Sequence, residues 1–480
     1  MTRAFLATFV AKLIRVLLRA VRRNASQLPG RLALSIDKNY IEHQAAFLRG
    51  GSVVVCGTNG KTTTNNIVAE TLEKANKRVV CNKVGANMAA GIASALVDAK
   101  GADIAVLELD ELSCKNVVPA LKPRYFLLLN LFRDQLDRAG EIDKVQDTIT
   151  QALKEAPDTH CIVLADDPLA YAAAKRARGE NLTTFGIKEI AHQQDDRVPE
   201  ARFCQYCGDA LTYRFRVYAQ LGDYYCPRGD FSRPSLDFAA THIMAEHAAF
   251  SFTVIHKQHQ SSGGALDDAL DDGLGNASRG VSSDASPGAS PGVSHDTLER
   301  DTISAPYAGT YMIYNLLGAF ALTHLLGVST KHLQTAISEY HPQNGRLQQL
   351  LVEGRQITLN LAKNPTGFNQ NISLVLADER QKAIYFVIND NYNDGRDISW
   401  IYDVDFERLQ NTHNITCIAG GSRAHDVQVR LKYAGINASI AFSAREALDA
   451  VPKDMPLYVL TNYSALWLIK DELERMERKG

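Results

Sequence analysis

The sequence has little net charge and no long uninterrupted apolar run, and both absences narrow the class of protein. Its 480 residues carry 52 Lys and Arg against 54 Asp and Glu, a formal net charge of −2. Binding to nucleic acid requires a concentrated basic surface, so we expect no nucleic-acid partner. Basic residues from Lys12 to Arg23 interrupt the apolar N-terminus, which therefore lacks the roughly 20 continuous apolar residues of a bilayer span. No small-residue cleavage site follows, so we do not expect a signal peptide.

A disulfide framework is also missing. Five of the eight cysteines stand singly along the chain, which is typical of proteins in a reducing compartment, and we expect a cytoplasmic protein. With 45% hydrophobic and 22% charged residues, the composition is that of an ordinary folded chain. A length of 480 residues is too great for one compact core, so two or three domains are predicted.

The N-terminal helix is predicted to be amphipathic. Helical spacing places five large apolar residues near one stripe, with basic residues on much of the remaining surface. The stripe comprises Phe5, Phe9, Leu13, Leu17 and Val21. Two interpretations remain open: either the helix lies in a membrane interface through this stripe, or it packs on the protein's own surface.

The pattern of strands and helices divides the chain into three parts. Residues 1–45 are the helix and a lead-in, 46–340 form an α/β domain, and 341–480 form a second, Rossmann-like α/β domain. Apolar strands that alternate with helices predict mostly parallel sheets covered on both faces. Two stretches interrupt the first domain. Residues 203–233 are predicted to be a small inserted module, and residues 257–304, rich in Gly, Ser and Asp, a disordered loop.

The most specific motif is GTNGKTTT, which runs from Gly57 to Thr64 between a strand of valines and a helix. The glycines let backbone N–H groups surround phosphate oxygens, and the helix presents its positive end to the same anion. Lys61 is expected to act in catalysis by neutralising phosphate charge, and the Thr62 hydroxyl is placed to bind Mg²⁺. The predicted ATP-binding residues of the loop are Gly57, Thr58, Asn59, Gly60, Lys61, Thr62 and Thr63.

This loop has only two residues between its glycines, and in that it resembles the Mur ligases and the folylpolyglutamate synthetases. The resemblance implies that four further residues serve ATP and magnesium. They are Glu108 at a strand end as a catalytic Mg²⁺ ligand, Asn315 near the nucleotide base, Arg346 reaching the phosphates from the second domain, and Asn364 of an Asn-Pro pair. The chain departs from the family pattern at Lys363, where many Mur ligases have His.

The stretch from Asn130 to Arg138 resembles a second family motif, an Asn followed by an Asp-His-hydrophobic-Asp run near a second metal. Asp134 and Asp137 match that run. Gln135 stands where the metal-binding His is expected, which removes the ligand on which a second Mg²⁺ of that pattern depends.

Three cysteines in the 203–233 module have the spacing of a zinc ribbon. Cys204 and Cys207 form one knuckle, and Cys226 begins a second. Tetrahedral Zn²⁺ requires four ligands, and Gly229 stands where the fourth cysteine would be. Either Asp230 supplies an oxygen ligand, or the module is held by its own packing without metal.

The ribbon, the DQLDRAGE segment and the NDNYNDGRDISW segment together resemble one branch of the Mur ligases, the MurT family of lipid II isoglutaminyl synthases. The resemblance implies ATP-dependent amidation of the α-carboxyl of D-glutamate in the lipid II stem peptide, through an acyl phosphate. Ammonia would come from a GatD-type glutaminase subunit in a heterodimer, since this chain has no recognisable amidotransferase nucleophile motif. Such a substrate would place the enzyme at the inner face of the cell membrane, with the amphipathic helix as a peripheral contact.

The same family is expected to lend an aspartate to the partner's catalytic Cys-His pair. The candidates follow the predicted strand AIYFVIND, at the edge where open α/β sheets carry functional residues. They are Asp390, Asp394 and Asp397, with Asp390 the first choice because it closes the predicted strand.

Two other functions remain open. One is an amino-acid-adding Mur ligase or folylpolyglutamate synthetase, in which an amine replaces ammonia. The other is a nucleotide-binding scaffold that has lost turnover, which Gln135, Gly229 and Lys363 favour.

Overall fold

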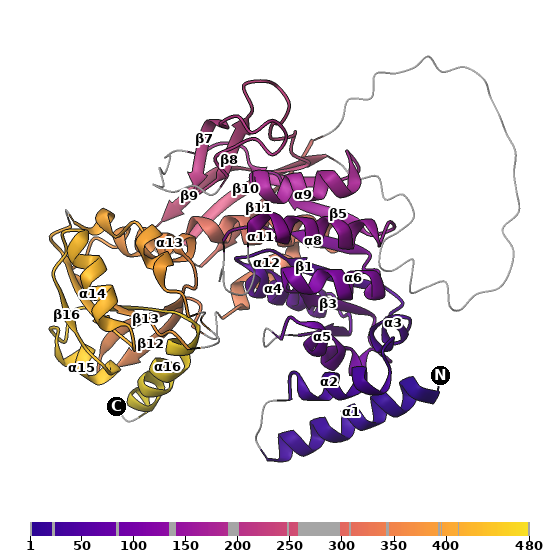
Figure 1. Cartoon of the computed structure of the whole chain (residues 1–480), viewed down its shortest axis with the longest axis horizontal. Helices are drawn as coiled ribbons and strands as arrows, with labels where there is room; N and C mark the ends of the chain where they lie inside the picture. Colours follow the sequence, from indigo (N-terminus) through magenta and orange to yellow (C-terminus); the bar gives the residue numbers. More distant parts are fainter. Residues whose placement is uncertain are drawn as a thin grey trace, which may run out of the picture.

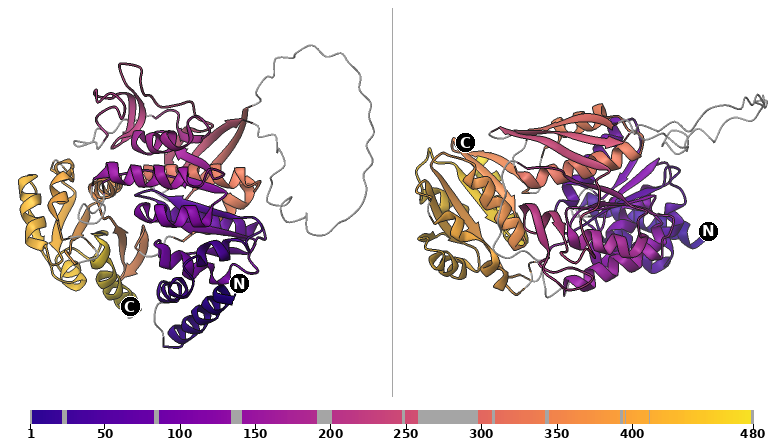
Figure 2. Two further views of the ribbon diagram at one scale, coloured as in Figure 1. Left: turned by 45° about the vertical axis from the view of Figure 1, so that its right-hand side comes forward. Right: turned by 90° about the horizontal axis from the view of Figure 1, so that it is seen from above.

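The computed structural model describes residues 2–21, 25–82, 86–133, 141–190, 201–246, 249–257, 298–306, 309–341, 345–391, 394, 396–410 and 412–478. Two sheets with their helices form the body of the chain (Figure 1). The N-terminal helices lie beside the larger unit, and the C-terminal unit lies on another side of it (Figure 2).

The N-terminal helix packs on the protein through its small residues. α1 (Thr2–Ala20) lies against α2 (Leu28–Ile36), which is followed by α3 (Tyr40–Ala45). Ala7 and Ala11 are fully buried, and the Thr8 hydroxyl lies 3.1 Å from the Tyr40 hydroxyl. All five residues of the predicted apolar stripe are exposed. The helix therefore does pack on the protein, but by the face opposite the stripe.

Among the described helices, none combines the length and the apolar character needed to cross a membrane.

The larger sheet has nine strands in the order β11-β10-β9-β6-β5-β4-β1-β3-β2. The seven strands from β9 to β2 in this order are parallel to one another. β10 and β11 extend the β9 edge of the sheet as antiparallel strands. Their bounds are β1 (Ser52–Cys56), β2 (Val79–Cys81), β3 (Ile104–Glu108), β4 (Tyr125–Leu128), β5 (His160–Leu164), β6 (Thr183–Ile187), β9 (Phe238–Glu246), β10 (Ala249–Lys257) and β11 (Leu298–Ala305). Every residue of β1 and β3 is buried, as central parallel strands covered on both faces require.

Helices cover both faces of this sheet. One face carries α4 (Lys61–Lys74), α11 (Thr310–Leu325) and α12 (Thr330–Glu339), and the other carries α5 (Ala89–Ala95), α6 (Cys114–Leu121), α8 (Ile142–Lys154) and α9 (Pro168–Arg178). Two 3₁₀ turns are η1 (Leu96–Asp98) and η2 (Glu111–Ser113). The nearly all-apolar α11 is buried along most of its length, because a helix without a polar face can only be stable inside a core. The predicted α/β fold class is confirmed.

The prediction of a disordered loop at residues 257–304 is wrong for the C-terminal end of that range. Residues 298–305 form β11, which pairs with β10 from Lys257 opposite Leu298 to Phe250 opposite Ala305. An edge strand needs only one buried face, so charged residues can alternate along the other, and the segment therefore looks like a polar loop in the sequence. The remainder of the predicted loop, residues 258–297, lies outside the described residues.

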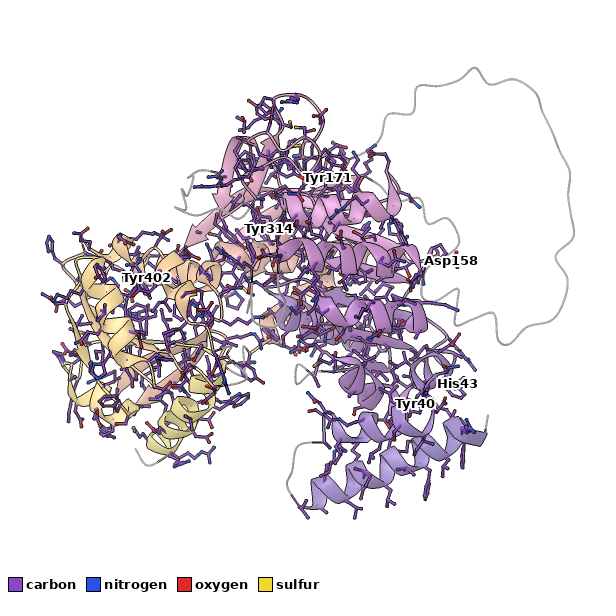
Figure 3. All side chains as sticks on the ribbon, viewed as in Figure 1. Tyr40, His43, Asp158, Tyr171, Tyr314 and Tyr402 are labelled. Carbon is purple, nitrogen blue, oxygen red and sulfur yellow. The ribbon has the colours of Figure 1, made fainter. Side chains whose placement is uncertain are left out.

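A separate hairpin belongs to the cysteine-containing module. β7 (Thr212–Tyr218) pairs antiparallel with β8 (Leu221–Tyr225). The module contacts α9 at Tyr171, which is labelled in Figure 3. The ring centroid of Phe231 in the module lies 5.8 Å from that of Tyr171. Aromatic packing therefore holds the module to the larger domain.

The C-terminal unit contains six strands in the order β12-β13-β17-β14-β15-β16, all parallel except β12. The strands are β12 (Gln348–Val352), β13 (Arg355–Leu361), β14 (Lys382–Val387), β15 (Ile415–Gly420), β16 (Ala438–Ile440) and β17 (Leu457–Thr461). The helices are α13 (Pro365–Leu376), α14 (Ala424–Tyr433), α15 (Ala444–Asp449) and α16 (Tyr463–Glu477), with 3₁₀ turns η4 (Ser399–Asp403) and η5 (Phe406–Leu409).

Candidate active site

The carboxyl edge of the larger sheet brings the predicted phosphate loop and Glu108 together. β1 lies between β3 and β4, so this is the point at which strand order reverses and where open α/β sheets bind ligands. The loop follows β1, Glu108 ends β3, and Asn130 follows β4. Gly57 and Gly60 have φ angles of +129° and +87°, which strongly favour glycine.

Lys61 opens α4 as a buried charge. Its Nζ donates to the Gly57 carbonyl and lies 3.1 Å from Glu111 Oε1. Burial lowers the pKa of Lys61, but the carboxylates of Glu111 and Glu108 outweigh burial and raise that pKa above its ordinary value. Burial raises the pKa of Glu111, but Lys61 and Lys363 outweigh it and bring that pKa below its usual range. The loop therefore carries a fixed positive charge.

Thr62 and Glu108 present two oxygen atoms side by side. The Thr62 hydroxyl donates to Glu108 Oε2 at 2.6 Å, and Asn87 donates to Glu108 Oε1 at 2.9 Å. Asn82 Oδ1 accepts from the Glu108 backbone N–H at 2.8 Å. Glu108 is 3% exposed and is held in one orientation by these contacts. Hydroxyl and carboxylate oxygens are ligands that Mg²⁺ takes, so these residues fit the predicted ion.

The segment after β4 holds the phosphate loop in place. Asn130 accepts from the Thr58 N–H through its carbonyl at 2.7 Å and from the Asn59 N–H through its side chain at 2.8 Å. The Phe132 N–H donates to the Thr58 hydroxyl at 2.9 Å. The rest of the predicted motif, including Asp134, Gln135 and Asp137, lies outside the described residues.

Asn315 on α11 lies directly against the loop and is 3% exposed. A Cβ atom built on Gly60 would come within 2.0 Å of Asn315 Oδ1. The preceding Tyr314 donates its hydroxyl to Asp166 at 2.7 Å, and Asp166 forms an ion pair with Arg233 at 2.9 Å. This buried network holds α11, and with it Asn315, against the phosphate loop.

Two contacts join the C-terminal unit to the loop region. Asn364 Nδ2 lies 3.3 Å from Asn59 Oδ1, while its own Oδ1 caps α13. Arg133 forms an ion pair with Asp403 at 3.1 Å. The predicted Asn364 therefore does reach the phosphate loop from the second domain.

Arg346 is linked to the loop through a tyrosine. It is half-buried, and its charge acts on the hydroxyls of Tyr311 and Tyr340, whose pKa values are raised mainly by burial. The Tyr340 hydroxyl in turn interacts with Thr63 of the loop. Tyr340 therefore interacts both with Arg346 and with the predicted phosphate site.

Asp390 lies beyond the end of its strand. β14 ends at Val387, so the prediction that Asp390 closes the strand is wrong. A strand of the parallel sheet ends where its ladder partners end, which periodicity alone does not reveal. Asp390 accepts from the Ser422 hydroxyl and pairs with Arg423, each at 2.8 Å, and these contacts hold the pKa of its carboxyl below the usual range.

The other two aspartates have different surroundings. Asp394 is 7% exposed and accepts from the Ser464 N–H at 2.7 Å in the first turn of α16. Asp397 is exposed and accepts from the Ser399 N–H at 2.8 Å, which lowers the pKa of Asp397. Of the three, Asp394 is the one that is buried in the protein's own structure.

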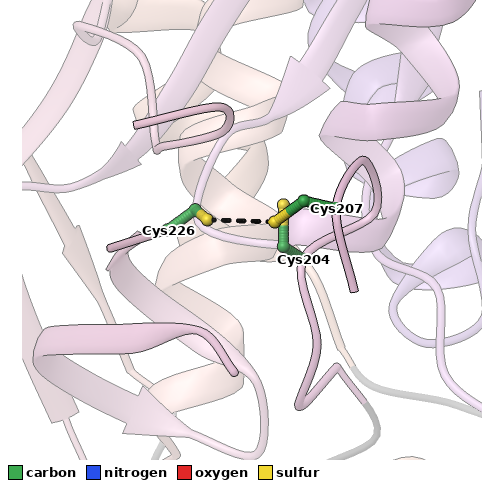
Figure 4. Close-up of side chains that lie close together, drawn as sticks. All are labelled: Cys204, Cys207 and Cys226. Carbon is green, nitrogen blue, oxygen red and sulfur yellow. Dashed lines mark hydrogen bonds between the residues drawn. The ribbon is translucent and has the colours of Figure 1, made fainter. Parts of the chain in front are cut away.

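The three cysteines of the module meet at one point (Figure 4). Their sulfur atoms all lie within 4.8 Å of one another, and Cys207 Sγ is 3.5 Å from Cys226 Sγ. A tetrahedral Zn²⁺ with Zn–S bonds of about 2.3 Å tolerates such spacing, so the three thiols fit the metal. The Asp230 carboxyl interacts with the Cys207 thiol, whereas Gly229 has a φ of +82° and offers no ligand.

Polar contacts and aromatic packing also support the module. Arg228 pairs with Asp209 at 2.6 Å and so links the two knuckles. The ring of Phe231 lies 5.2 Å from Tyr206 and 5.3 Å from Tyr224. Both interpretations of the module therefore have a structural basis.

Sequence reasoning missed residues that hold the predicted ones. Glu111 pairs with Lys61, and Asn87 orients Glu108. The sequence does carry a signal for Glu111 as a site residue, since Glu111 is the last acid of the ELDE run that begins at the end of β3. Asn87 had none, because its loop approaches Glu108 only through the tertiary structure.

Comparisons with known proteins agree with this geometry. A family model for the Mur ligase middle domain matches residues 55–215, and one for the MurT ligase C-terminal region matches residues 361–466. The chain is 31% identical over 485 residues to "Lipid II isoglutaminyl synthase (glutamine-hydrolyzing) subunit MurT" of Staphylococcus aureus (strain COL), covering 100% of this chain and 99% of that protein. The subunit of the same name from Streptococcus pneumoniae (strain ATCC BAA-255 / R6) is 29% identical over 457 residues, 92% and 90% of the two chains.

Solved structures share the fold. A pseudomurein peptide ligase type C from Methanothermus fervidus superposes with a TM-score of 0.64 at 16% identity, over 88% of this chain and 78% of that one. The MurF ligase of Thermotoga maritima in complex with ADP gives a TM-score of 0.59 at 14% identity, over 93% and 84%. The Mur ligase family model and the full-length relatives, with the phosphate loop, define a ligase of the Mur type. Within that class, the chain belongs to the MurT family.

Proposed function

We infer that this chain amidates the α-carboxyl of D-glutamate in the lipid II stem peptide to D-isoglutamine, using ATP and ammonia from a GatD-type glutaminase subunit. The observation that carries the proposal is the full-length similarity to MurT subunits, which extends through both the ATP-binding and the C-terminal regions. The buried Lys61 and the Thr62–Glu108 pair support the ATP-dependent part.

The proposed reaction has two steps. An oxygen of the substrate carboxylate attacks the γ-phosphorus of ATP, which forms an acyl phosphate and releases ADP. Ammonia then attacks the acyl carbon, the bond to the phosphate oxygen breaks, and the nitrogen loses a proton as the amide forms. The fixed charge of Lys61 stabilises the charge on the transferred phosphoryl group, together with loop N–H groups other than those of Thr58 and Asn59. Those two N–H groups donate to Asn130.

Thr62 and Glu108 would hold Mg²⁺, which neutralises phosphate oxygens when bound. The family resemblance assigns Asn315 to the nucleotide base, and Asn315 lies against Gly60 of the phosphate loop. Asn364 is assigned to the nucleotide because it reaches Asn59. Arg346 is assigned to the phosphates because it acts on Tyr340, which contacts Thr63 of the loop. These assignments bring both domains to one reaction centre.

An aspartate of the C-terminal unit would complete the partner's Cys-His pair. Asp390 and Asp397 are the better candidates, because Asp394 is buried and engaged by Ser464. Asp390 remains our first choice, since Ser422 and Arg423 hold its carboxylate charged at the carboxyl edge of the sheet. Cys204, Cys207, Cys226 and Asp230 would hold Zn²⁺, which would tie the two knuckles together.

The test combines the chain with its glutaminase partner, ATP, Mg²⁺, glutamine and lipid II, and reads the product by mass spectrometry. Amidation replaces a hydroxyl by an amine and lowers the mass by one unit. Addition of an amino-acid residue would instead identify an amino-acid-adding ligase, and intact ATP would identify a silent nucleotide-binding protein. Lys61→Met should slow the reaction at least about 100-fold, whereas Lys154→Met, at an exposed position of α8, should not.

A further inference from the structure

Most of the large apolar side chains of α1 are exposed, and only Val10, Ile14 and Leu18 among them are half-buried. Six helix residues and one just beyond it form this outer face of α1: Phe5 (77% exposed), Leu6 (52%), Phe9 (60%), Leu13 (49%), Val16 (64%), Leu17 (52%) and Val21 (64%). At 3.6 residues per turn they occupy one arc of the helix, opposite the buried Ala7 and Ala11. The packing that fixes α1 on the protein therefore leaves its most hydrophobic arc in water.

Such an arrangement is unfavourable for a helix that serves only its own domain. A helix docks by its apolar side because burial of apolar surface stabilises the contact by about 25 cal/mol per Å². Here the only fully buried residues among the described side chains of α1 are Ala7 and Ala11, whereas two phenylalanines and most of the leucines are exposed. Contiguous exposed apolar patches of this kind mark interaction sites.

The charges around the outer face have one sign. Residues 1–36 contain no Asp or Glu. Lys12 and Arg19, seven residues apart, are exposed on the same edge of the arc, and Arg3 is exposed on the other side of the helix. Arg15 differs from them, because it pairs with Asp98 and donates to the Ser94 carbonyl at 2.6 Å, which anchors the docked face.

We propose that the outer face of α1 docks on a bilayer that contains anionic lipid. The apolar arc enters the boundary between headgroups and acyl chains, and the basic edge meets lipid phosphates. With 19 residues, α1 provides a contact about 28 Å long in the plane of the surface. A second copy of the chain is a poorer occupant, since it would oppose two basic edges with no acid in residues 1–36 to pair with them.

This inference deepens the proposed function, because lipid II is itself held in a membrane, but the docking surface rests on α1 alone. The experiment measures binding of the full chain to vesicles of phosphatidylcholine with and without phosphatidylglycerol, by sedimentation. Vesicle binding needs no substrate or ATP, so its failure and a failure of amidation are separate results.

Two sets of variants test the two parts of the surface. Phe5→Ser, Phe9→Ser and Leu13→Ser together should lower partitioning onto anionic vesicles about 100-fold or more. The matched control combines Phe442→Ser, Tyr433→Ser and Leu468→Ser, side chains of the C-terminal unit that are 65%, 79% and 62% exposed, and should bind like the unaltered chain. Lys12→Gln with Arg19→Gln should lower binding roughly 25-fold at low salt and much less at high salt. As the matched control, Lys154→Gln with Lys432→Gln should leave vesicle binding unchanged.

Three results would overturn the proposal. The variant with serines at Phe5, Phe9 and Leu13, called the serine variant below, could bind vesicles as well as the unaltered chain does. The unaltered chain could be a dimer that the serine variant converts to a monomer, which would make a second copy the occupant. Addition of the glutaminase subunit could release the chain from vesicles, which would make that subunit the occupant. In support, the serine variant should keep its amidation rate on detergent-dispersed lipid II and lose it on vesicle-embedded lipid II.

Discussion

Substitution of Gly60 by alanine should weaken ATP binding through two separable effects. The first is backbone strain, because Gly60 has a φ of +87°, a conformation that costs an L-residue roughly 1–2 kcal/mol. The second is a collision, since the new Cβ would come within 2.0 Å of Asn315 Oδ1. Asn315 is buried on a packed helix, so the loop must move instead.

The affinity loss follows from what the loop does. A displaced N–H group loses a hydrogen bond to a charged phosphate, which is worth about 1.5–3 kcal/mol. That energy corresponds to a roughly 10- to 150-fold rise in the Kd for ATP, measured by isothermal titration of a non-hydrolysable analogue. Gly354→Ala isolates the strain, because Gly354 has a φ of +79° with nothing within 4 Å of its Cβ position. It should destabilise the chain without changing ATP affinity.

A double substitution identifies the collision. Asn315→Ala removes the colliding oxygen, so Gly60→Ala with Asn315→Ala should lose less affinity than the sum of the two single losses. Wild-type affinity in Gly60→Ala would refute the assignment of the loop as a phosphate cradle. Additive losses in the cycle would refute the contact between Gly60 and Asn315.

Three further predictions concern other parts of the chain. Asp167 caps the N-terminus of α9, is fully buried and accepts from the Leu131 and Leu169 N–H groups. Burial raises the pKa of Asp167 to about 7. Because the folded-state pKa exceeds the unfolded one, the free energy of unfolding should fall between pH 4 and pH 7, and Asp167→Asn should flatten that fall in denaturant titrations. If the module binds metal, elemental analysis should find one Zn²⁺ per chain, and Cys207→Ser and Asp230→Ala should each lower that zinc content. Absence of zinc from the unaltered chain would mean that aromatic packing alone stabilises the module. Asp394→Ala should lower the free energy of unfolding by about 1 kcal/mol, because it removes the Ser464 contact, and should leave the glutaminase activity of the complex intact. Asp390→Ala should abolish that glutaminase activity and leave the free energy of unfolding nearly unchanged. The opposite pattern would exchange the roles of the two aspartates.

Prediction from the sequence succeeded where local physics determines the structure. The valines before Gly57 predict a strand, and the pattern after Gly60 predicts a helix. The structure confirms both, as β1 and α4. The spacing of Cys204, Cys207 and Cys226 brought three sulfur atoms together. The predicted α/β class and the family resemblance are both confirmed.

Prediction failed where neighbours in space decide the outcome. The charged run at residues 298–305 looks like a loop until β10 lies beside it and pairs with it. The sequence predicts Asp390 at the end of a strand, but the ladder of β14 ends at Val387. The sequence could not distinguish an N-terminal helix on the membrane from one on the protein, because both require the same amphipathic pattern.

The sequence alone determined which chemistry the chain carries. Glycines that adopt left-handed φ, a lysine at a helix N-terminus and an acid at a strand end depend on short-range backbone geometry, so their pattern survives in the linear order of residues. Only the tertiary structure decided how those groups are held. Glu111 reaches Lys61, Asn130 holds Thr58 and Asn59, and Asn364 crosses from the second domain, because strand order and domain packing place segments far apart in the sequence within hydrogen-bonding distance.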